Sequence, residues 1–276
     1  MNQKTLDKLH EEELKILDEV DRVCHELNIC YYITAGTLLG AVRHGGFIPW
    51  DDDLDIVMPR DDYERFLKEC NGVIDKKYYC QSRYNSDVFP NNFAKVRIKN
   101  TAFVEKGLEP IADRLDMGIY IDVFPLDSAK KENGIQKWQK FFIERATALY
   151  QIKIGLYDDA SFLKKTLSKL FSKKALLKIR YNLAVKYNKE SNRFYINLGS
   201  RYDIKKQTIL KEKYGVPCRL RFENREYNAP QDYLYILEHI YGKSYMELPP
   251  IEKRRTHNPI KLSFDLNGPD EIVDDE

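Results

Sequence analysis

The sequence predicts an α/β (α+β) fold in which a β-sheet core flanked by helices is followed by a lysine-rich helical second lobe. The chain has 276 residues, of which 43% are hydrophobic, so it can bury a substantial core. Strand-like and helix-like patterns alternate up to about Asp127, and residues 130–190 are helical in pattern. We therefore divide the chain into a core, 1–128, and a basic helical lobe, 129–276, whose C-terminal segment returns to the core.

The first elements follow from periodicity and from the glycines and prolines that end them. Residues 5–27 carry apolar side chains at helical spacing, which predicts an amphipathic helix. Residues 29–36 ("ICYYITAG") predict a strand that stops in a tight turn at Gly36, and residues 37–44 ("TLLGAVRH") a short helix that begins at Thr37. A second strand is expected at 53–58 ("DLDIVM"), ended by Pro59.

The remaining elements are predicted in the same way. Asp61 and Asp62 are expected to cap a helix through "YERFLKEC". Strands are expected at "NFAKVRI", "TAFVEK" and, most clearly, "GIYIDVFPL", and helices over 130–190. The last part predicts strands and a turn in "VPCRLRFENREYNAP", a helix in "QDYLYILEHIYG", and an extended segment in "LPPIEKRRTHNP".

Composition excludes several classes of protein. The five cysteines are scattered and odd in number, which argues against a disulfide framework or a zinc site. The charged start does not resemble a secretory signal, and no run approaches the roughly 18–20 apolar residues of a membrane span. The expected compartment is the cytoplasm.

The net charge is only +2, but the charged residues are unevenly distributed along the chain. From Ala129 to Glu190 there are fifteen Lys or Arg against five Asp or Glu, whereas the tail from Asp265 to Glu276 has six acids and no base. An anionic partner for the basic part and a solvated lysine-rich helical face explain this asymmetry equally well.

Two aspartates on one predicted strand indicate a metal site. Side chains alternate faces along a strand, so Asp53 and Asp55 share one face while Leu54 and Ile56 point into the core. Two adjacent carboxylates repel each other, and a divalent cation between them removes the repulsion. Oxygen ligands suit Mg²⁺ or Mn²⁺. The alternative is an exposed acidic loop, which the apolar neighbours Phe47, Ile48 and Trp50 make a poor explanation.

A phosphate-binding arrangement precedes these acids. Gly36 allows close approach of a ligand to the backbone, and Thr37 offers a hydroxyl and an amide at a helix start, where an anion is favoured. Lys95 and Arg97 share one face of a predicted strand. Two interpretations are equally good: the two cations bind phosphate oxygens, or they lie on a solvent-facing edge strand. Arg43, beside His44, is a candidate for substrate contact, with surface polarity as the alternative. His257 is a candidate acid–base group or a structural histidine.

These motifs carry a family resemblance. "GT" followed by "DLD" resembles the signature of the nucleotidyltransferase fold, whose mixed sheet carries two aspartates on one strand and a third on a neighbouring strand. The longer "YYITAGTLLGAVRHGGFIPWDDDLDIVMPRDDYERF" closely resembles the LicD family of phosphocholine transferases, and more distantly the fukutin-related ribitol-phosphate transferases. "FAKVRIKNTAFVE", "GIYIDVFPLD" and "YGKSYMELPPIEKRRTH" also resemble LicD segments. The resemblance is weakest over 128–212.

The resemblance implies an enzyme that transfers phosphocholine from CDP-choline to a hydroxyl of a cell-surface glycan precursor, teichoic acid or lipopolysaccharide, and releases CMP. It implies that Asp122 is the third carboxylate, as a metal ligand or as a general base. Asp51 and Asp52 have no settled role. Alternatives are transfer of another phospho-alditol from a CDP-alditol, transfer of a nucleotide from an NTP, and a non-catalytic binding protein of the same fold.

The expected partners follow from this reaction. They are the CDP-activated donor and a lipid-linked glycan acceptor, and not nucleic acid. The basic, partly apolar segment 161–180 ("SFLKKTLSKLFSKKALLKIR") is a candidate for contact with the inner membrane surface or with a phosphate-rich acceptor.

Overall fold

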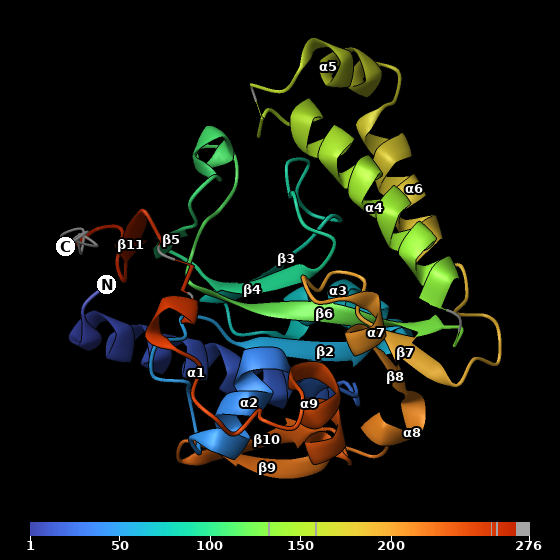
Figure 1. The fold of residues 1–276 in the computed structure, drawn as a ribbon. Coiled ribbons are helices and arrows are strands. Elements are labelled where there is room, and N and C mark those ends of the chain that lie inside the picture. Colours follow the sequence, from blue (N-terminus) through green and yellow to red (C-terminus); the bar gives the residue numbers. More distant parts are fainter. Residues whose placement is uncertain (132, 158, 255, 258, 269–276) are drawn as a thin grey trace.

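A computed structural model describes residues 1–131, 133–157, 159–254, 256–257 and 259–268. Its centre is a seven-stranded mixed sheet with helices packed around it (Figure 1). The five main strands lie in the order β1-β2-β6-β4-β3, and β7 and β8 extend the sheet from the far end of β6. Their bounds are β1 Tyr32–Ile33, β2 Asp55–Pro59, β3 Tyr78–Gln81, β4 Ala94–Ile98, β6 Tyr120–Ala129, β7 Phe194–Ile196 and β8 Thr208–Leu210.

The sheet is mixed because β2 and β6 run parallel while the other neighbours are antiparallel. Three helices of the first half pack against these strands: α1 (Gln3–Glu26), α2 (Ala35–Arg43) and α3 (Arg60–Val73). The apolar stripe of α1 is buried in the main core together with residues of β2, β4 and β6. The predicted mixed α/β architecture is confirmed.

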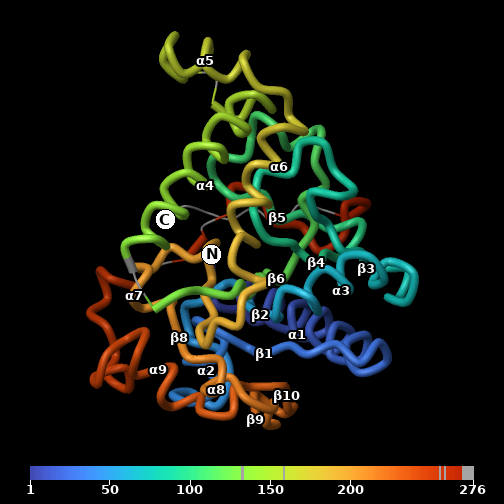
Figure 2. The backbone as a smooth tube through the Cα atoms, turned by 90° about the vertical axis from the view of Figure 1, so that its right-hand side faces the viewer, coloured from blue at the N-terminus to red at the C-terminus, as the bar shows by residue number. Residues whose placement is uncertain are grey.

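The lysine-rich region forms a separate layer of helices. It contains α4 (Asn133–Lys153), α5 (Phe162–Lys169) and α6 (Lys173–Ala184). In both views α4 and α6 lie side by side above the sheet, and α5 lies at the outer end of this pair (Figures 1 and 2). A smaller hydrophobic core, which includes Phe89, Ile111, Tyr150 and Leu176, joins these helices to the loop that follows β3.

The C-terminal third returns to the first half. Its elements are α7 (Ile204–Gln207), α8 (Lys211–Tyr214), β9 (Cys218–Phe222), β10 (Arg225–Ala229), α9 (Tyr233–Tyr241), the 3₁₀ turn η2 (Ile251–Lys253) and β11 (Lys261–Ser263). Strand β11 pairs with β5 (Ala102–Val104). The 3₁₀ turn η1 (Glu109–Ile111) follows β5 in the chain. The division at 128/129 stays a prediction, although β6 crosses it and β7 extends the same sheet.

Several boundaries differ from those expected. Helix α2 begins at Ala35, so Gly36 lies in its first turn and Thr34, not Thr37, is the N-cap. Strand β2 begins at Asp55, so Asp53 precedes the strand. The short β3, β7, β8 and β11 and the one-turn helices α7 and α8 were not expected, because segments of three or four residues carry too little periodicity.

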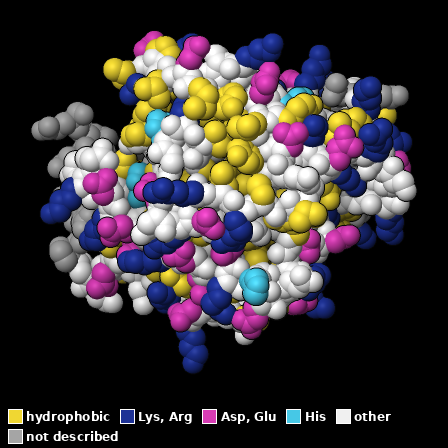
Figure 3. All heavy atoms as spheres, turned by 90° about the horizontal axis from the view of Figure 1, so that it is seen from below, with side chains coloured by type: hydrophobic (Ala, Val, Ile, Leu, Met, Phe, Trp, Pro, Cys, Tyr) yellow, Lys and Arg dark blue, Asp and Glu magenta, His cyan; other side chains and the backbone are white. Residues whose placement is uncertain are grey.

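No helix within the described residues combines the length and the apolarity needed to cross a bilayer. The acidic tail beyond residue 268 lies outside the described residues. On the side of β9, β10 and α8, seen in Figure 3, Lys and Arg side chains are interspersed with Asp and Glu.

Candidate active site

Three adjacent strands place charged side chains in one row. Asp55 of β2 pairs in register with Asp122 of β6, and Asp122 in turn pairs with Lys95 of β4. Directly opposed residues of neighbouring strands project from the same face of a sheet, so the three side chains are neighbours. The flanking Ile121 and Val123 are fully buried on the opposite face, as their alternation with Asp122 predicts.

Asp53, Asp55 and Asp122 converge although Asp53 is not part of β2. Each contributes a carboxylate oxygen within 4.8 Å of the others. Burial raises the pKa of Asp53 to about 6. Burial and the neighbouring charges of Asp53 and Asp122 also raise the pKa of Asp55. Three carboxylates that repel each other in this way form an oxygen donor set suited to a hard divalent cation such as Mg²⁺ or Mn²⁺.

Lys95 is the buried counter-charge of this row. Its Nζ lies 2.9 Å from Asp122 Oδ1 and 2.9 Å from Glu105 Oε1, and 3.2 Å from the ring centroid of Tyr120. Burial alone would raise the pKa of Glu105, but Lys95 outweighs it and lowers the pKa to about 2. Glu105, just after β5, was not singled out from the sequence, since nothing local distinguishes "FVEK" from a surface strand end.

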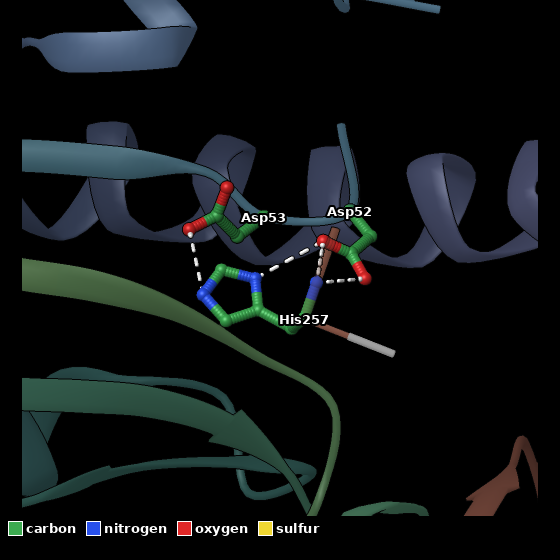
Figure 4. Close-up of side chains that lie close together, drawn as sticks. All are labelled: Asp52, Asp53 and His257. Carbon is green, nitrogen blue, oxygen red and sulfur yellow. Dashed lines mark hydrogen bonds and ion pairs between the residues drawn. The ribbon is translucent and has the colours of Figure 1, made fainter. Parts of the chain in front are cut away.

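Asp52 and His257 form a second contact beside Asp53 (Figure 4). The backbone N–H of His257 donates to both oxygens of Asp52 at 2.9 Å, and His257 Nδ1 lies 3.0 Å from Asp52 Oδ1. Its Nε2 faces Asp53 Oδ2 at 3.7 Å. Burial lowers the pKa of His257, but the hydrogen bond to Asp52 and the charge of Asp53 outweigh it and raise the pKa to about 9. His257 therefore carries positive charge at neutral pH and offsets part of the acidic row.

Gly36 and Thr37, in the first turn of α2, lie next to Asp55 but have different roles. Gly36 lines the cleft above the acids, and a Cβ there would collide with the carboxylate of Asp51. Thr37 is buried, and its Oγ1 accepts a hydrogen bond from the Asp55 N–H at 2.7 Å. Thr34 donates its N–H to the Asp55 carbonyl. Thr37 thus fixes the backbone of Asp55 and is not among the described residues that line the cleft.

The three basic residues predicted to bind phosphate or substrate occupy different positions relative to the cleft. Lys95 and Arg97 lie on one face with Tyr120 between them, but β4 is an inner strand and both side chains are buried, so the edge-strand alternative is wrong. Arg97 donates to Gln81 Oε1 and to the Gly118 carbonyl and does not line the cleft as described. Arg43 does line it and donates to the carbonyls of residues 245 and 247, which ties α2 to the C-terminal segment.

The row of acids lies in a cleft of about 900 Å³, which is large enough for a nucleotide-activated donor and part of an acceptor. Its walls come from α2, β4, β6 and the segments around residue 200 and over 244–253 and 256–257. Aromatic side chains are prominent among its lining residues: Trp50, Phe93, Phe124, Tyr202, Tyr241 and Tyr245.

A mixed sheet with acids at the ends of adjacent strands, beside a glycine-containing helix start, defines a nucleotidyltransferase-type domain. Residues 28–153 match the LicD/FKTN/FKRP nucleotidyltransferase domain, and this part of the chain belongs to that family. The family resemblance predicted from the sequence is confirmed.

Curated relatives agree with this result. The lipopolysaccharide cholinephosphotransferase LicD of Haemophilus influenzae is 27% identical over 257 residues, which cover 89% of this chain and 92% of that protein. Two uncharacterized proteins match shorter stretches: one of Rickettsia typhi is 46% identical over 63 residues, and one of Rickettsia prowazekii is 62% identical over 42 residues. They cover 21% and 14% of this chain, and 20% and 16% of their own lengths. Most of this chain is therefore distantly similar to the Haemophilus protein.

Proposed function

We propose that this chain transfers phosphocholine from CDP-choline to a hydroxyl of a cell-surface glycan precursor, a teichoic acid or lipopolysaccharide intermediate, and releases CMP. The observation that carries the proposal is the row of Asp53, Asp55 and Asp122 at the base of a large cleft. The distant similarity to a lipopolysaccharide cholinephosphotransferase along most of the chain supports the choice of donor and acceptor.

In this mechanism the acceptor hydroxyl attacks the phosphorus that bears choline, and the bond from that phosphorus to the bridging oxygen of CMP breaks. Asp53 and Asp55 would hold Mg²⁺ or Mn²⁺, with Asp122 as a third ligand or as the base that accepts the hydroxyl proton. A bound divalent ion supplies neutralisation of the diphosphate charge. Lys95 holds Asp122 in place through its ion pair. Gly36 and Arg43 are the sequence-predicted donor-binding residues that line the cleft.

The cleft also suits a choline group. A quaternary ammonium donates no strong hydrogen bond and is bound best by the faces of aromatic rings. Tyr202 and Tyr241 contact each other edge to face, with 5.6 Å between ring centroids, and Tyr245 and Trp50 line the same cleft. Aromatic walls above a carboxylate row favour a cationic alcohol over a polyhydroxylated one such as ribitol.

The donor is tested by incubating the purified protein with Mg²⁺ or Mn²⁺, an acceptor-containing membrane extract, and CDP-choline, CDP-ribitol or CDP-glycerol in parallel. We expect metal-dependent CMP release to be at least about tenfold faster from CDP-choline, since one good cation–aromatic contact in a desolvated site contributes ~2 kcal/mol.

The other outcomes identify the alternatives. Faster release from CDP-ribitol or CDP-glycerol would assign the site to a phospho-alditol transferase. Release of pyrophosphate from an NTP, without CMP release from any of the three donors, would assign it to nucleotide transfer. Absence of every one of these activities in protein that binds metal would contradict the proposed enzyme.

We also propose that α5 binds the anionic inner surface of the membrane that carries a lipid-linked acceptor. Phe162 is 86% exposed, Leu163 77% and Leu170 73%, at the outer end of the helical layer (Figures 1 and 2). Lys164 and Lys169 lie among these apolar side chains on the same short helix. Exposed apolar residues interspersed with lysines are typical of helices that lie in the membrane interface.

Co-sedimentation with liposomes tests this second proposal. We expect binding to vesicles that contain anionic lipid, little binding to neutral vesicles, and loss of about 1 kcal/mol of binding free energy per removed basic charge. The test variant reverses the charge of Lys164, Lys165, Lys173 and Lys174. The control reverses the same number of charges at exposed lysines of the first half, Lys4, Lys68, Lys76 and Lys106. Lys173 and Lys174 lie at the start of α6, so equal binding by both variants would contradict a role for α5 and this adjoining turn.

A further inference from the structure

A second cavity lies behind the wall of the cleft, where the helical layer meets the sheet. It is about 30 Å³ in volume, room for two water molecules or for one small ion. Three arginines from different parts of the chain line it: Arg60 of α3, Arg83 of the loop after β3, and Arg180 of α6. Asn91, Phe93 and Gly199 line both this cavity and the cleft, so the two share a wall.

Two of these arginines have carboxylate partners. Arg60 donates to both oxygens of Asp127 at 2.8 and 2.7 Å and to Glu64 at 2.9 Å. Arg83 donates to Glu64 through Nη2 at 3.1 Å. Within this cluster, three guanidinium groups therefore face two carboxylates, which leaves one positive charge without a counter-charge.

The excess charge lies on Arg180. Arg180 is 5% exposed, and among the described residues its hydrogen bonds go to neutral groups, the Asn92 side-chain oxygen and the Asn91 carbonyl. Its Nη1 is buried without any hydrogen-bond partner among the described residues. Burial, with Arg83 adding repulsion, lowers the pKa of Arg180 to about 10. A guanidinium that remains charged at neutral pH is costly to bury unless an anion compensates it.

We propose that this cavity binds one small inorganic anion, chloride or a phosphate ion, through Arg180 Nη1 and the adjacent Arg83. The anion supplies the missing negative charge and satisfies the unpaired Nη1 donor. Asn92 links the same arginine to α4, because its Nδ2 donates to Thr147 Oγ1 at 3.1 Å. The bound anion therefore neutralises the arginine through which α6 contacts the 91–93 segment, and this segment forms part of the cleft wall.

Melting temperature measured at constant ionic strength tests the site. Replacing gluconate, which is too large for the cavity, by chloride or by phosphate should raise the melting temperature of the wild-type protein by about 3 °C in a saturable manner. In Arg180→Met this rise should be lost. Arg193→Met is the control, since Arg193 is 75% exposed and far more solvated, and it should respond as the wild type does. The anion that saturates at the lower concentration identifies the natural type of ligand.

Equal rises in the wild type and in Arg180→Met would mean a general salt effect and would overturn the proposal. If Arg180→Met does not fold, diffraction from wild-type crystals soaked in bromide provides the decision. An anomalous peak within hydrogen-bond distance of Arg180 Nη1 supports the site. A cavity that contains only water under the same conditions overturns it.

Discussion

Asp55→Ala is expected to reduce turnover by at least about a thousandfold while the protein remains folded. A divalent ion at such a site contributes several kcal/mol of charge stabilisation in the transition state, and each 1.36 kcal/mol corresponds to roughly a factor of ten. Asp53→Ala should behave in the same way, because both carboxylates belong to the same cluster. The measurement is the rate of CMP release at saturating donor and metal.

The same variant should be more stable than the wild type when metal is removed. Asp55 is buried next to Asp53 and Asp122, and its raised pKa reflects burial and their repulsion, so removal of its carboxylate relieves an unfavourable contact. Added Mg²⁺ should raise the melting temperature of the wild type but not that of Asp55→Ala. Asp61→Ala, at an exposed position in the first turn of α3, is the control. Full activity, or an unchanged response to metal, would refute the assignment of these ligands.

Lys95→Met is expected to produce the largest loss of stability. The methionine keeps most of the side-chain volume but leaves Asp122 and Glu105 buried without their shared counter-charge. Removing one partner of a buried ion pair costs about 3–5 kcal/mol. Denaturant unfolding of the metal-free protein should therefore show this loss, and activity should fall because Asp122 loses the group that positions it.

A double variant separates charge from packing. Lys95→Met combined with Glu105→Gln removes one of the two uncompensated carboxylates and should recover part of the lost free energy of unfolding. The control, Lys99→Met, changes an exposed lysine just beyond the end of β4. Strictly additive effects of the two substitutions would show that Lys95 and Glu105 do not interact and would contradict the described geometry.

The site combines one acidic row with two cations that offset it from different directions. Lys95 reaches the row from β4, within the sheet, and His257 reaches it from the C-terminal segment. Neither cation bridges Asp53 and Asp55, so the position between these two carboxylates stays suited to a divalent ion. The order of the chain therefore matters, because the C-terminal segment completes a site whose acids all lie in the first 122 residues.

Local pattern was sufficient for the longer elements. The apolar stripe of α1 and the alternation in β6 predicted both the elements and their buried faces, and Asp122 faces the site as that alternation requires. The family motifs identified the nucleotidyltransferase domain. These signals are local, since each depends on residues within one helix or one strand.

Local pattern failed where a residue's role depends on a distant partner. The sequence does not distinguish Lys95 from Arg97, yet of these two only Lys95 lines the cleft. Strand β6 places Asp122 beside Lys95, whereas Arg97 donates a hydrogen bond to the Gly118 carbonyl. Thr37 was expected to contact phosphate but supports the Asp55 backbone instead.

By itself the sequence determined the family resemblance and the longer sheet-forming segments and predicted the three aspartates, since these follow from short-range periodicity and contiguous motifs. Tertiary structure alone decided which charges meet. Asp52 and His257 are 205 positions apart, and Arg180 joins Arg60 and Arg83 only across the junction of helices and sheet. Coulomb and hydrogen-bond energies depend on distance in space, which the order of residues does not encode directly.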